Sequence, residues 1–367
     1  MAKIILTGLN GYGGNFVKEL LSDAENSLVA VVSGAPEKSP YYPQLKERGV
    51  LYFPNIETCL NETCPDMAII YTPMHVHNRE VKACLLRKIS VFCEKPLVPD
   101  MDKWQELKAL AEETGVTIAV GFQWSYSEGI QALKKDILAG KYGRIKSMKT
   151  LVDWVRPVSY YAGSSWKGKM LDGDGNVIFD TPISNAASHF LHNMLFLAGP
   201  DMYSALQPFD SAEYEMECRR AHAIETFDTV MLKLACGDIK LHFFGTLASD
   251  APHPVEFKIT CEKGTVVYPY GEEKHIAGIH EDGSITLYSN PDADRMRHYR
   301  KVATDIADGR RVACDIDTVN PFQHVIEHIR LHGDIKPFSP EEVHAEEDKL
   351  FVKGLSAQLL KAYNQTL

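Results

Sequence analysis

Short apolar runs alternate with longer amphipathic segments along the first 125 residues. The runs are rich in β-branched residues, whereas the amphipathic segments repeat their apolar positions every three or four residues, as helices do. Asp100 is a suitable N-cap and Gly115 a suitable stop for one such helix. The expected strands are Lys3–Thr7, Leu28–Val32, Met67–Tyr71, Ser90–Cys93 and Val116–Val120, and the expected helices are Asn15–Ser22, Arg79–Lys88 and Asp100–Glu113. This order predicts an α/β domain with a doubly wound parallel sheet.

A period of two dominates from about residue 145 to residue 289, which predicts a large, mostly antiparallel open sheet with one covered face. The expected strands here are Ser147–Val155, Thr229–Ala235, Lys240–Thr246, Val255–Cys261 and Thr265–Tyr268. The helix Glu128–Leu138 leads into this region, a helix near Ser184–Leu197 interrupts it, and the last 75 or so residues are expected to be helical with breaks at Pro321 and Pro337. We therefore expect two domains, residues 1–125 and 126–367, and the terminal helices could return to pack against the first.

Composition narrows the class of protein. A chain of 367 residues with 45% hydrophobic and 24% charged residues is typical of a globular protein of two domains. Its formal net charge of −10 argues against nucleic acid or an anionic membrane as a partner, and no apolar run is long enough to span a bilayer. The eight cysteines lack zinc-site spacing, so we expect reduced thiols, a cytoplasmic location and no metal.

A glycine-rich segment joins the first expected strand to the first expected helix. Small residues in such a turn let the backbone approach a pyrophosphate, which the free N–H groups of the helix N-terminus bind. The spacing GxxGxGG is a variant of the dinucleotide fingerprint, and glycines that serve only a tight turn are the alternative. The expected cofactor contacts are Gly8, Asn10, Gly11, Tyr12, Gly13 and Gly14, which makes residues 1–125 a candidate Rossmann domain.

The end of the second expected strand bears on the choice of nucleotide. An acidic residue there would bind the ribose 2′-hydroxyl of NAD. Here Ser33 follows the strand and Lys38 lies close by, a pair that suits a 2′-phosphate, so we favour NADP over NAD. Lys38 as a merely solvated loop residue remains the alternative.

Three further segments complete a pattern: Tyr71-Thr72-Pro73 with His77, Glu94-Lys95-Pro96 after an apolar strand, and Asn185 four residues before His189. With the glycine turn, they resemble the Gfo/Idh/MocA oxidoreductase family over nearly the whole chain. The resemblance implies a Rossmann domain, a C-terminal α/β domain, a nicotinamide cofactor, and a sugar or polyol substrate. It also implies a homodimer or homotetramer formed through the C-terminal sheet.

The resemblance assigns roles to these residues. It implies that Lys95 reaches the active site, where an ammonium group can hold the substrate oxygen, and that Thr72, Pro73, His77 and Glu94 lie near the cofactor. His189 is our candidate general base, because its ordinary pKa is near neutrality; a core histidine is the alternative.

Asn185 stands where the family has an aspartate. Its amide cannot ionise, which shifts the expected chemistry to Lys95 and His189. On one helix, residues four apart share a face, so Asn185 and His189 would project together. His192, one turn further along, is a candidate substrate contact.

Other candidates follow from their position in the chain. Gln123, which we assign to the cofactor, and Trp124 and Tyr126, which we assign to the substrate, follow the last strand of the first domain, where ligands of open sheets bind. An aromatic and basic segment precedes the Asn185 helix and could stack on a sugar ring or bind an acidic group. Its candidates are Arg156, Tyr161 and Trp166, and the segment also contains Tyr160 and Lys167, although packing explains such aromatic residues equally well.

The leading hypothesis is an NAD(P)-dependent oxidoreductase that transfers hydride between a nicotinamide and a hydroxyl or carbonyl of a sugar or polyol. A second is an enzyme with tightly bound NAD that oxidises its substrate transiently to allow elimination or epimerisation. A third is a non-catalytic nucleotide-sensing regulator. Retention of Lys95 and His189 argues against the third.

Overall fold

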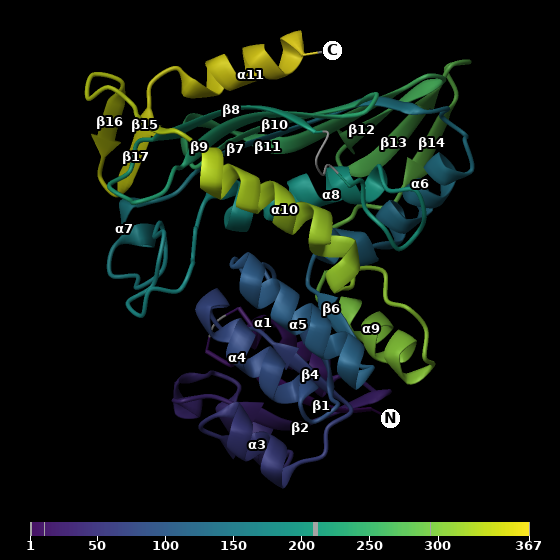
Figure 1. Cartoon of the computed structure of the whole chain (residues 1–367), viewed down its shortest axis with the longest axis vertical. Coiled ribbons are helices and arrows are strands. Elements are labelled where there is room, and N and C mark those ends of the chain that lie inside the picture. The colour runs from purple at the N-terminus through teal and green to yellow at the C-terminus, as the bar shows by residue number, and fades with distance from the viewer. Residues whose placement is uncertain (1, 11, 208–211, 294, 367) are drawn as a thin grey trace. The chain divides into compact units, whose positions relative to one another are not determined.

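The computed structural model describes residues 2–10, 12–207, 212–293 and 295–366. The chain divides into two compact units (Figure 1), the first made of Met1–Tyr126 and Asp294–Val319 and the second of Ser127–Ala293 and Asn320–Leu367. The predicted fold class is confirmed: the first unit holds a parallel sheet and the second a large mixed sheet.

The described part of the first unit contains a six-stranded parallel sheet in the order β3-β2-β1-β4-β5-β6. Its strands are β1 (Ala2–Thr7), β2 (Asn26–Val32), β3 (Leu51–Phe53), β4 (Met67–Ile70), β5 (Ser90–Cys93) and β6 (Ile118–Val120). Its helices are α1 (Gly14–Leu21), α2 (Tyr42–Glu47), α3 (Ile56–Glu62), α4 (Met74–Leu85), α5 (Met101–Thr114) and α9 (His298–Ala307), with short turns η1 (Pro36–Lys38) and η2 (Gln123–Tyr126). The direction of winding reverses between β1 and β4, where open sheets of this order bind ligands.

Local signals in the sequence account for several boundaries in this unit. The Asp100 side chain accepts hydrogen bonds from the backbone N–H groups of Asp102 and Lys103, and Gly115 ends α5 with a φ of 70°. Both expected caps are therefore confirmed. Helix α4 begins at Met74 instead of the expected Arg79, because Pro73 immediately precedes it with its φ already at −57°.

The described part of the second unit contains an eleven-stranded sheet with the main path β14-β13-β12-β11-β7-β10-β9-β8-β15. The strands are β7 (Ile145–Val155), β8 (Glu213–Arg220), β9 (Thr229–Cys236), β10 (Ile239–Thr246), β11 (Ala248–Cys261), β12 (Gly264–Tyr270), β13 (His275–His280), β14 (Ile285–Tyr288), β15 (Ile335–Pro337), β16 (Val343–Glu346) and β17 (Lys349–Val352). The helices are α6 (Glu128–Leu138), α7 (Val158–Tyr161), the π-helical turn η3 (Pro182–Ala186), α8 (Ser188–Leu197), α10 (Ile316–His332), which begins in the first unit, and α11 (Leu355–Gln365). Most pairs are antiparallel, but β10 runs parallel to β7 and β15 parallel to β8.

Two expectations about the last 75 residues are wrong. Pro321 lies inside α10 without ending it; as the sixth residue of the helix it removes one backbone hydrogen bond, and the helix continues to His332. Residues 335–352 form strands, not helix; β16 and β17 pair as a hairpin whose turn includes Glu347 at a φ of 52°.

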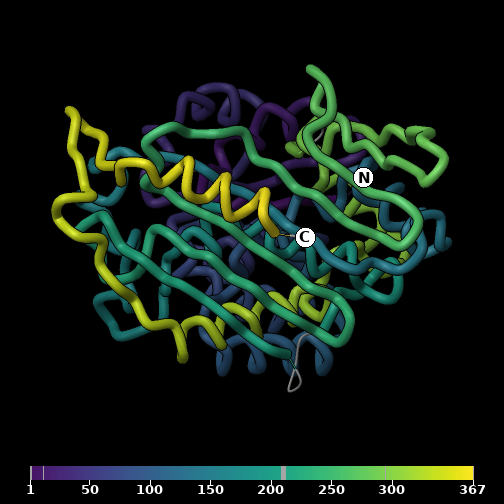
Figure 2. The backbone as a smooth tube through the Cα atoms, turned by 90° about the horizontal axis from the view of Figure 1, so that it is seen from above, coloured from purple at the N-terminus to yellow at the C-terminus, as the bar shows by residue number. Residues whose placement is uncertain are grey.

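Helices cover both faces of the large sheet near β7 (Figure 1). On one face Leu151 of β7 joins a buried cluster with Leu355, Leu359 and Tyr363 of α11, and Figure 2 shows α11 (yellow) lying across the strands. On the other face Trp154 contacts Phe190 of α8, with ring centroids 6.0 Å apart. Side chains on opposite faces of β7 thus contribute to two hydrophobic cores, one on each face of the sheet.

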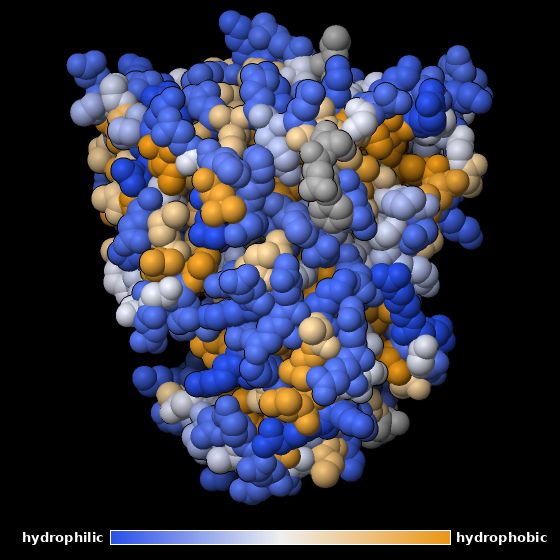
Figure 3. All heavy atoms as spheres, viewed as in Figure 1, coloured by the Kyte–Doolittle hydropathy of each residue, from blue (hydrophilic) through white to orange (hydrophobic). Residues whose placement is uncertain are grey.

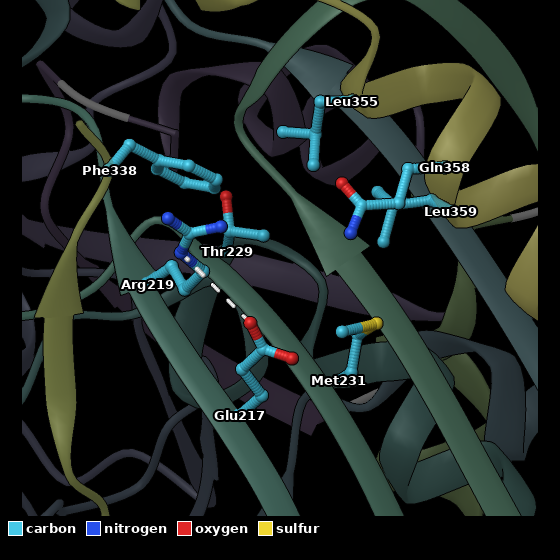
Figure 4. Close-up of a pocket in the computed structure, with 8 residues that line it drawn as sticks. All are labelled: Glu217, Arg219, Thr229, Met231, Phe338, Leu355, Gln358 and Leu359. Carbon is cyan, nitrogen blue, oxygen red and sulfur yellow. Dashed lines mark ion pairs between the residues drawn. The ribbon is translucent and has the colours of Figure 1, made fainter. Parts of the chain in front are cut away.

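A small pocket lies between the α11 face of the sheet and α11 itself (Figure 4). Arg219 of β8 lies in it with its guanidinium carbon 3.9 Å from the ring centroid of Phe338. The lining residues are Glu217, Arg219, Thr229, Met231, Phe338, Leu355, Gln358 and Leu359. None of them is a candidate site residue from the sequence.

The surface in Figure 3 is mostly hydrophilic, with hydrophobic residues in small groups. Among the described residues, the large apolar side chains that remain more than half exposed are Leu86 after α4, Leu287 of β14 and Leu331 of α10. All eight cysteines are free thiols. No helix in the described part of the chain combines the length and the apolar character that crossing a bilayer requires.

The turn after β1 yields a stability prediction. Gly8 has a φ of 82°, and a Cβ there would lie 2.3 Å from the carbonyl oxygen of Tyr71. We expect Gly8→Ala to lower the free energy of unfolding by about 2–4 kcal/mol, from the left-handed backbone and the overlap together. Gly34→Ala is the control, because no atom lies within 4 Å of its Cβ position. Chemical unfolding followed by circular dichroism measures both, and equal stability of the two variants would contradict the prediction.

Candidate active site

The glycine turn places the N-terminus of α1 at the carboxyl end of β1. Gly13 and Gly14 pack so closely on the turn that a Cβ at either would lie 2.9 Å from a backbone carbonyl oxygen. Helix α1 has no side-chain cap and no acidic residue in its first turn. An anion such as a pyrophosphate therefore fits this end, where N–H groups and the helix dipole favour negative charge. Gly11, also expected here, lies outside the described residues.

Asn10 links this turn to the loop after β2. Its side-chain amide donates to the carbonyl oxygen of Ala35 at 2.6 Å and to the hydroxyl of Ser33 at 3.3 Å. The structure thus brings two candidate cofactor residues together. Lys38 lies in η1, is exposed, and has no ion pair recorded within the described ranges.

Tyr12 and Gln123 also come together. The Gln123 side-chain amide donates to the Tyr12 hydroxyl at 3.2 Å, and the Tyr12 ring lies 5.8 Å from that of Tyr71. Gln123 belongs to η2 at the end of β6, so residues from opposite ends of the domain sequence meet at one edge of the sheet.

Trp124 and Tyr126, which we expect to contact the substrate, are both buried. Each is at most 5% exposed, and the Tyr126 hydroxyl lies 2.7 Å from the carbonyl oxygen of Cys314 and 3.1 Å from that of Val120. These contacts hold residues 314–315 beside β6, an arrangement that favours a structural role over a substrate contact.

The Glu94-Lys95-Pro96 segment directly follows β5, and the Lys95–Pro96 peptide bond is cis. His77 of α4 is 1% exposed and lies beneath this segment. Its Nδ1 is 2.9 Å from the carbonyl oxygen of Pro96, and its Nε2 is 2.7 Å from that of Thr72. Burial lowers the pKa of His77, although the carbonyl oxygens oppose that shift. His77 is therefore a positioning residue: it joins the segments that follow β4 and β5.

Two carboxyl groups lie at the same edge. Glu80 accepts hydrogen bonds from the hydroxyls of Thr7 at 2.9 Å and Thr72 at 2.8 Å, and burial raises its pKa. Burial raises the pKa of Glu94 to about 7, with Lys95 acting in the opposite direction. The Oε2 atom of Glu94 is buried without a hydrogen-bond partner among the described residues.

The second unit holds Asn185 and His189, but not on one continuous helix. Pro182 and the reciprocal hydrogen bonds of Thr181 and Ser184 start the π-helical turn η3, and the Ala187 N–H reaches the carbonyl oxygen of Pro182 at 2.6 Å. The backbone then changes at Ala187, whose φ is −112°, before α8 begins. The expected spacing of four residues on a single helix face is wrong for this reason.

Asp180 is a candidate functional residue that sequence reasoning missed. It is 6% exposed, and its Oδ1 accepts a hydrogen bond from the Asn185 side-chain amide at 2.7 Å. A carboxylate therefore does lie beside Asn185, five residues earlier than the family pattern indicates. One signal in the sequence could have indicated Asp180: it is an acidic residue directly before Thr181-Pro182, and such a pair is typical of helix starts.

The two histidines of α8 differ in environment. His189 lies in the first turn of α8 and is partly exposed. His192 is 1% exposed, stacks with Phe196 at 6.0 Å and meets the Phe322 ring at 6.2 Å, and burial lowers its pKa to about 3. Such burial disfavours the substrate contact expected of His192, which packs in the core.

The aromatic and basic segment expected to contact substrate surrounds the end of β7. Arg156 stacks on Trp154 and Tyr160, Tyr161 packs on His222 with ring centroids 4.9 Å apart, and Trp166 lies beside Lys167. Lys95 belongs to the first unit and His189 to the second, so their expected meeting across one pocket stays a prediction.

Comparison with known proteins adds to this geometry. Residues 2–122 match the Gfo/Idh/MocA family model, described as an oxidoreductase family with an NAD-binding Rossmann fold. The myo-inositol dehydrogenase Hyg17 of Streptomyces leeuwenhoekii is 25% identical over 197 residues, which are 54% of each protein. The chain thus spans about half the length of the curated relatives it matches.

Solved structures share the fold across most of the chain. An oxidoreductase from Agrobacterium radiobacter, solved with NAD+, L-tartaric acid and magnesium, has a TM-score of 0.72 at 13% identity and covers 91% of this chain and 97% of its own. The WlbA dehydrogenase of Bordetella pertussis, solved with NADH and UDP-GlcNAcA, has a TM-score of 0.70 at 20% identity and covers 89% of this chain and 95% of its own. The resemblance seen in the sequence is confirmed for the first unit: residues 2–122 match the model of the Gfo/Idh/MocA oxidoreductase family with its NAD-binding Rossmann fold.

Proposed function

We propose that this protein is an NAD(P)-dependent oxidoreductase that transfers hydride between a nicotinamide and a hydroxyl or carbonyl of a sugar, polyol or related small molecule. The observation that carries the proposal is the placement of Lys95 in the first unit. It follows β5 at the edge of the sheet where the uncapped N-terminus of α1 also lies, and His77 fixes its segment. A cofactor bound through that helix end would bring its reactive ring to the same edge.

Each of the candidate residues has a separate role in the proposed hydride transfer. The bound nicotinamide supplies or accepts the hydride. In oxidation, Lys95 donates a hydrogen bond to the substrate oxygen and stabilises the negative charge that develops there. His189 accepts the hydroxyl proton, so that one proton and one hydride leave the alcohol. Asn185, held by Asp180, orients a substrate hydroxyl by hydrogen bonding.

The relatives support a sugar or polyol as the substrate. One is a myo-inositol dehydrogenase, and the WlbA structure contains a nucleotide sugar. We also propose a cytoplasmic location, in keeping with the free thiols, and a homodimer or homotetramer formed through the large sheet.

Replacement of Lys95 tests the proposal. We expect Lys95→Ala to lower the rate of hydride transfer by about 100-fold to 10,000-fold, because the charge on the substrate oxygen loses its partner. The nucleotide affinity should change little. The measurement is nicotinamide absorbance across a panel of sugars and polyols, with exposed Lys46→Ala as control.

Activity of Lys95→Ala within a few-fold of the wild type would refute the role of Lys95. Turnover of substrate without net change in reduced cofactor would instead support the transient-oxidation alternative.

The choice of nucleotide is a separate prediction. Because no carboxylate directly follows β2 and Lys38 is exposed nearby, we expect NADP to bind more tightly than NAD. Lys38→Ala should weaken NADP binding roughly tenfold and leave NAD binding unchanged, since only the 2′-phosphate would lose a charged partner. Calorimetric titration with both nucleotides measures this, and tighter binding of NAD by the wild type would overturn it.

Glu94 predicts a pH dependence of the cofactor-free protein. Its pKa rises from 4.5 to about 7 in the folded chain, so its contribution to stability is present below about 4.5 and is lost as the pH rises through about 7. Glu94→Gln removes that loss. The free energy of unfolding of the variant minus that of the wild type should therefore grow by about 1–3 kcal/mol between pH 4.5 and pH 8.

Chemical unfolding at a series of pH values gives the difference profile. Glu37→Gln, at an exposed position of the same unit, is the matched control and should give a flat profile. A flat profile for Glu94→Gln as well would contradict the prediction.

A further inference from the structure

Two cations of the second unit share one aromatic ring. The guanidinium carbon of Arg156 lies 5.2 Å from the ring centroid of Tyr160 and 5.5 Å from that of Trp154. The ammonium nitrogen of Lys167 lies 3.9 Å from the same Tyr160 centroid. Like charges held over one ring repel each other, so the arrangement favours an anion between them.

No carboxylate of the described residues forms an ion pair with either cation, although the chain carries a net charge of −10. The Nε of Arg156 is buried and has no acceptor in the described part of the chain. Burial lowers the pKa of Lys167; the charge of Asp180 opposes that shift, and the charge of Arg156 adds to it. A buried guanidinium donor without an acceptor is unusual, because such groups are normally hydrogen-bonded.

Two buried acidic groups of this region, Asp180 and Asp228, have other partners. Asp180 accepts hydrogen bonds from the backbone N–H of Gly168 at 2.7 Å and from the Asn185 amide at 2.7 Å. Asp228 is buried and lies 2.8 Å from Nδ1 of His222. Neither forms an ion pair with Arg156 or Lys167. The positive charge of these two residues, which we call the cation cluster, is therefore only partly offset.

The backbone holds both cations in place. Nε2 of His222 lies 3.3 Å from the carbonyl oxygen of Arg156. Gly168, next to Lys167, has a φ of 68°, and its carbonyl oxygen accepts a hydrogen bond from the Glu225 N–H at 2.8 Å. A Cβ at Gly168 would lie 2.5 Å from Cγ2 of Ile224, which explains the glycine. The backbone that carries the two cations is therefore held by hydrogen bonds and close packing.

The cluster lies on the same face of the large sheet as α8. The Trp154 ring, over which the Arg156 guanidinium lies, packs against Phe190 of α8. Phe190 directly follows the candidate base His189 in the chain. The charge of Asp180 affects the pKa values of Tyr160 and Lys167, and the same carboxylate accepts a hydrogen bond from Asn185. The cations therefore lie in the same region of this unit as the candidate catalytic residue Asn185.

We propose that Arg156 and Lys167 together bind a carboxylate or phosphate group of the substrate, so that the substrate is an acidic sugar or polyol and not a neutral one. This inference rests on the proposed function for the chemistry at the reacting carbon, but not for the binding itself. The planar guanidinium matches a two-oxygen acceptor, and the ammonium adds a second charge. The rings of Tyr160 and Trp154 hold the cations and exclude water around the anion.

Binding can be measured on the full chain without turnover. The probes are D-glucuronate, D-galacturonate, D-glucose 6-phosphate and D-galactose 6-phosphate, with D-glucose and D-galactose as neutral parents. Calorimetric titration in the presence of saturating NADP, then separately NAD, gives the dissociation constants. We expect at least one acidic probe to bind tenfold or more tightly than its parent, and the preferred class, uronate or phosphate, identifies the anion.

The variants assign that preference to the cluster. Arg156→Gln and Lys167→Gln should each raise the dissociation constant of the acidic probe roughly 10-fold to 100-fold. Arg156→Lys keeps the charge and should retain most of the affinity, which separates loss of charge from loss of folding. Lys336→Gln, at an exposed lysine of the same unit, is the control and should bind as the wild type does.

Equal affinity for acidic probes and neutral parents, no binding of any acidic probe, or unchanged affinity in both Gln variants would each overturn the inference. Hydride transfer by the wild type on neutral sugars but on none of the acidic probes would also overturn it while leaving the proposed function intact. Conversely, the acidic probes could bind through Arg156 while the Lys95→Ala variant stays fully active. That result would refute the catalytic role of Lys95 and support the anion site.

Discussion

The buried polar face of α4 is the interaction on which the first unit depends. His77 and Glu80, one turn apart, reach the carboxyl ends of three different strands: Glu80 bonds Thr7 at the end of β1 and Thr72 after β4, and His77 joins Thr72 to Pro96 after β5. Buried polar groups are tolerated because each of these has partners. One helix therefore sets where the glycine turn and the Lys95 segment lie relative to each other.

Much of the first unit follows from local sequence signals. Five of its strands match apolar runs, and α5 begins and ends at the expected cap residues Asp100 and Gly115. Strand β3 (Leu51–Phe53) and helices α2 and α3 were not foreseen, because each is short and carries too few residues to show a period. What the sequence cannot show is the pairing of distant groups, such as the Gln123 amide with the Tyr12 hydroxyl.

The second unit is harder to predict near its candidate site. Small residues around Asn185 suit a π-helical turn as well as an α-helix, so the break at Ala187 leaves no pattern in the sequence. Helix α8 is buried on nearly every side, so its sequence does not indicate which histidine faces the core. The sequence therefore predicts a substrate contact for His192 beside the candidate base His189, although His192 lies in the interior.

The hydrogen bond between Asn185 and Asp180 also constrains how this protein can diverge. An aspartate at position 185 would face the Asp180 carboxylate across 2.7 Å, and two carboxyl groups at that separation must share a proton. A single substitution toward the family residue would thus create a repulsive pair. Positions 180 and 185 should change together in evolution, and lineages with an acidic residue at 185 should carry a neutral or basic one at 180.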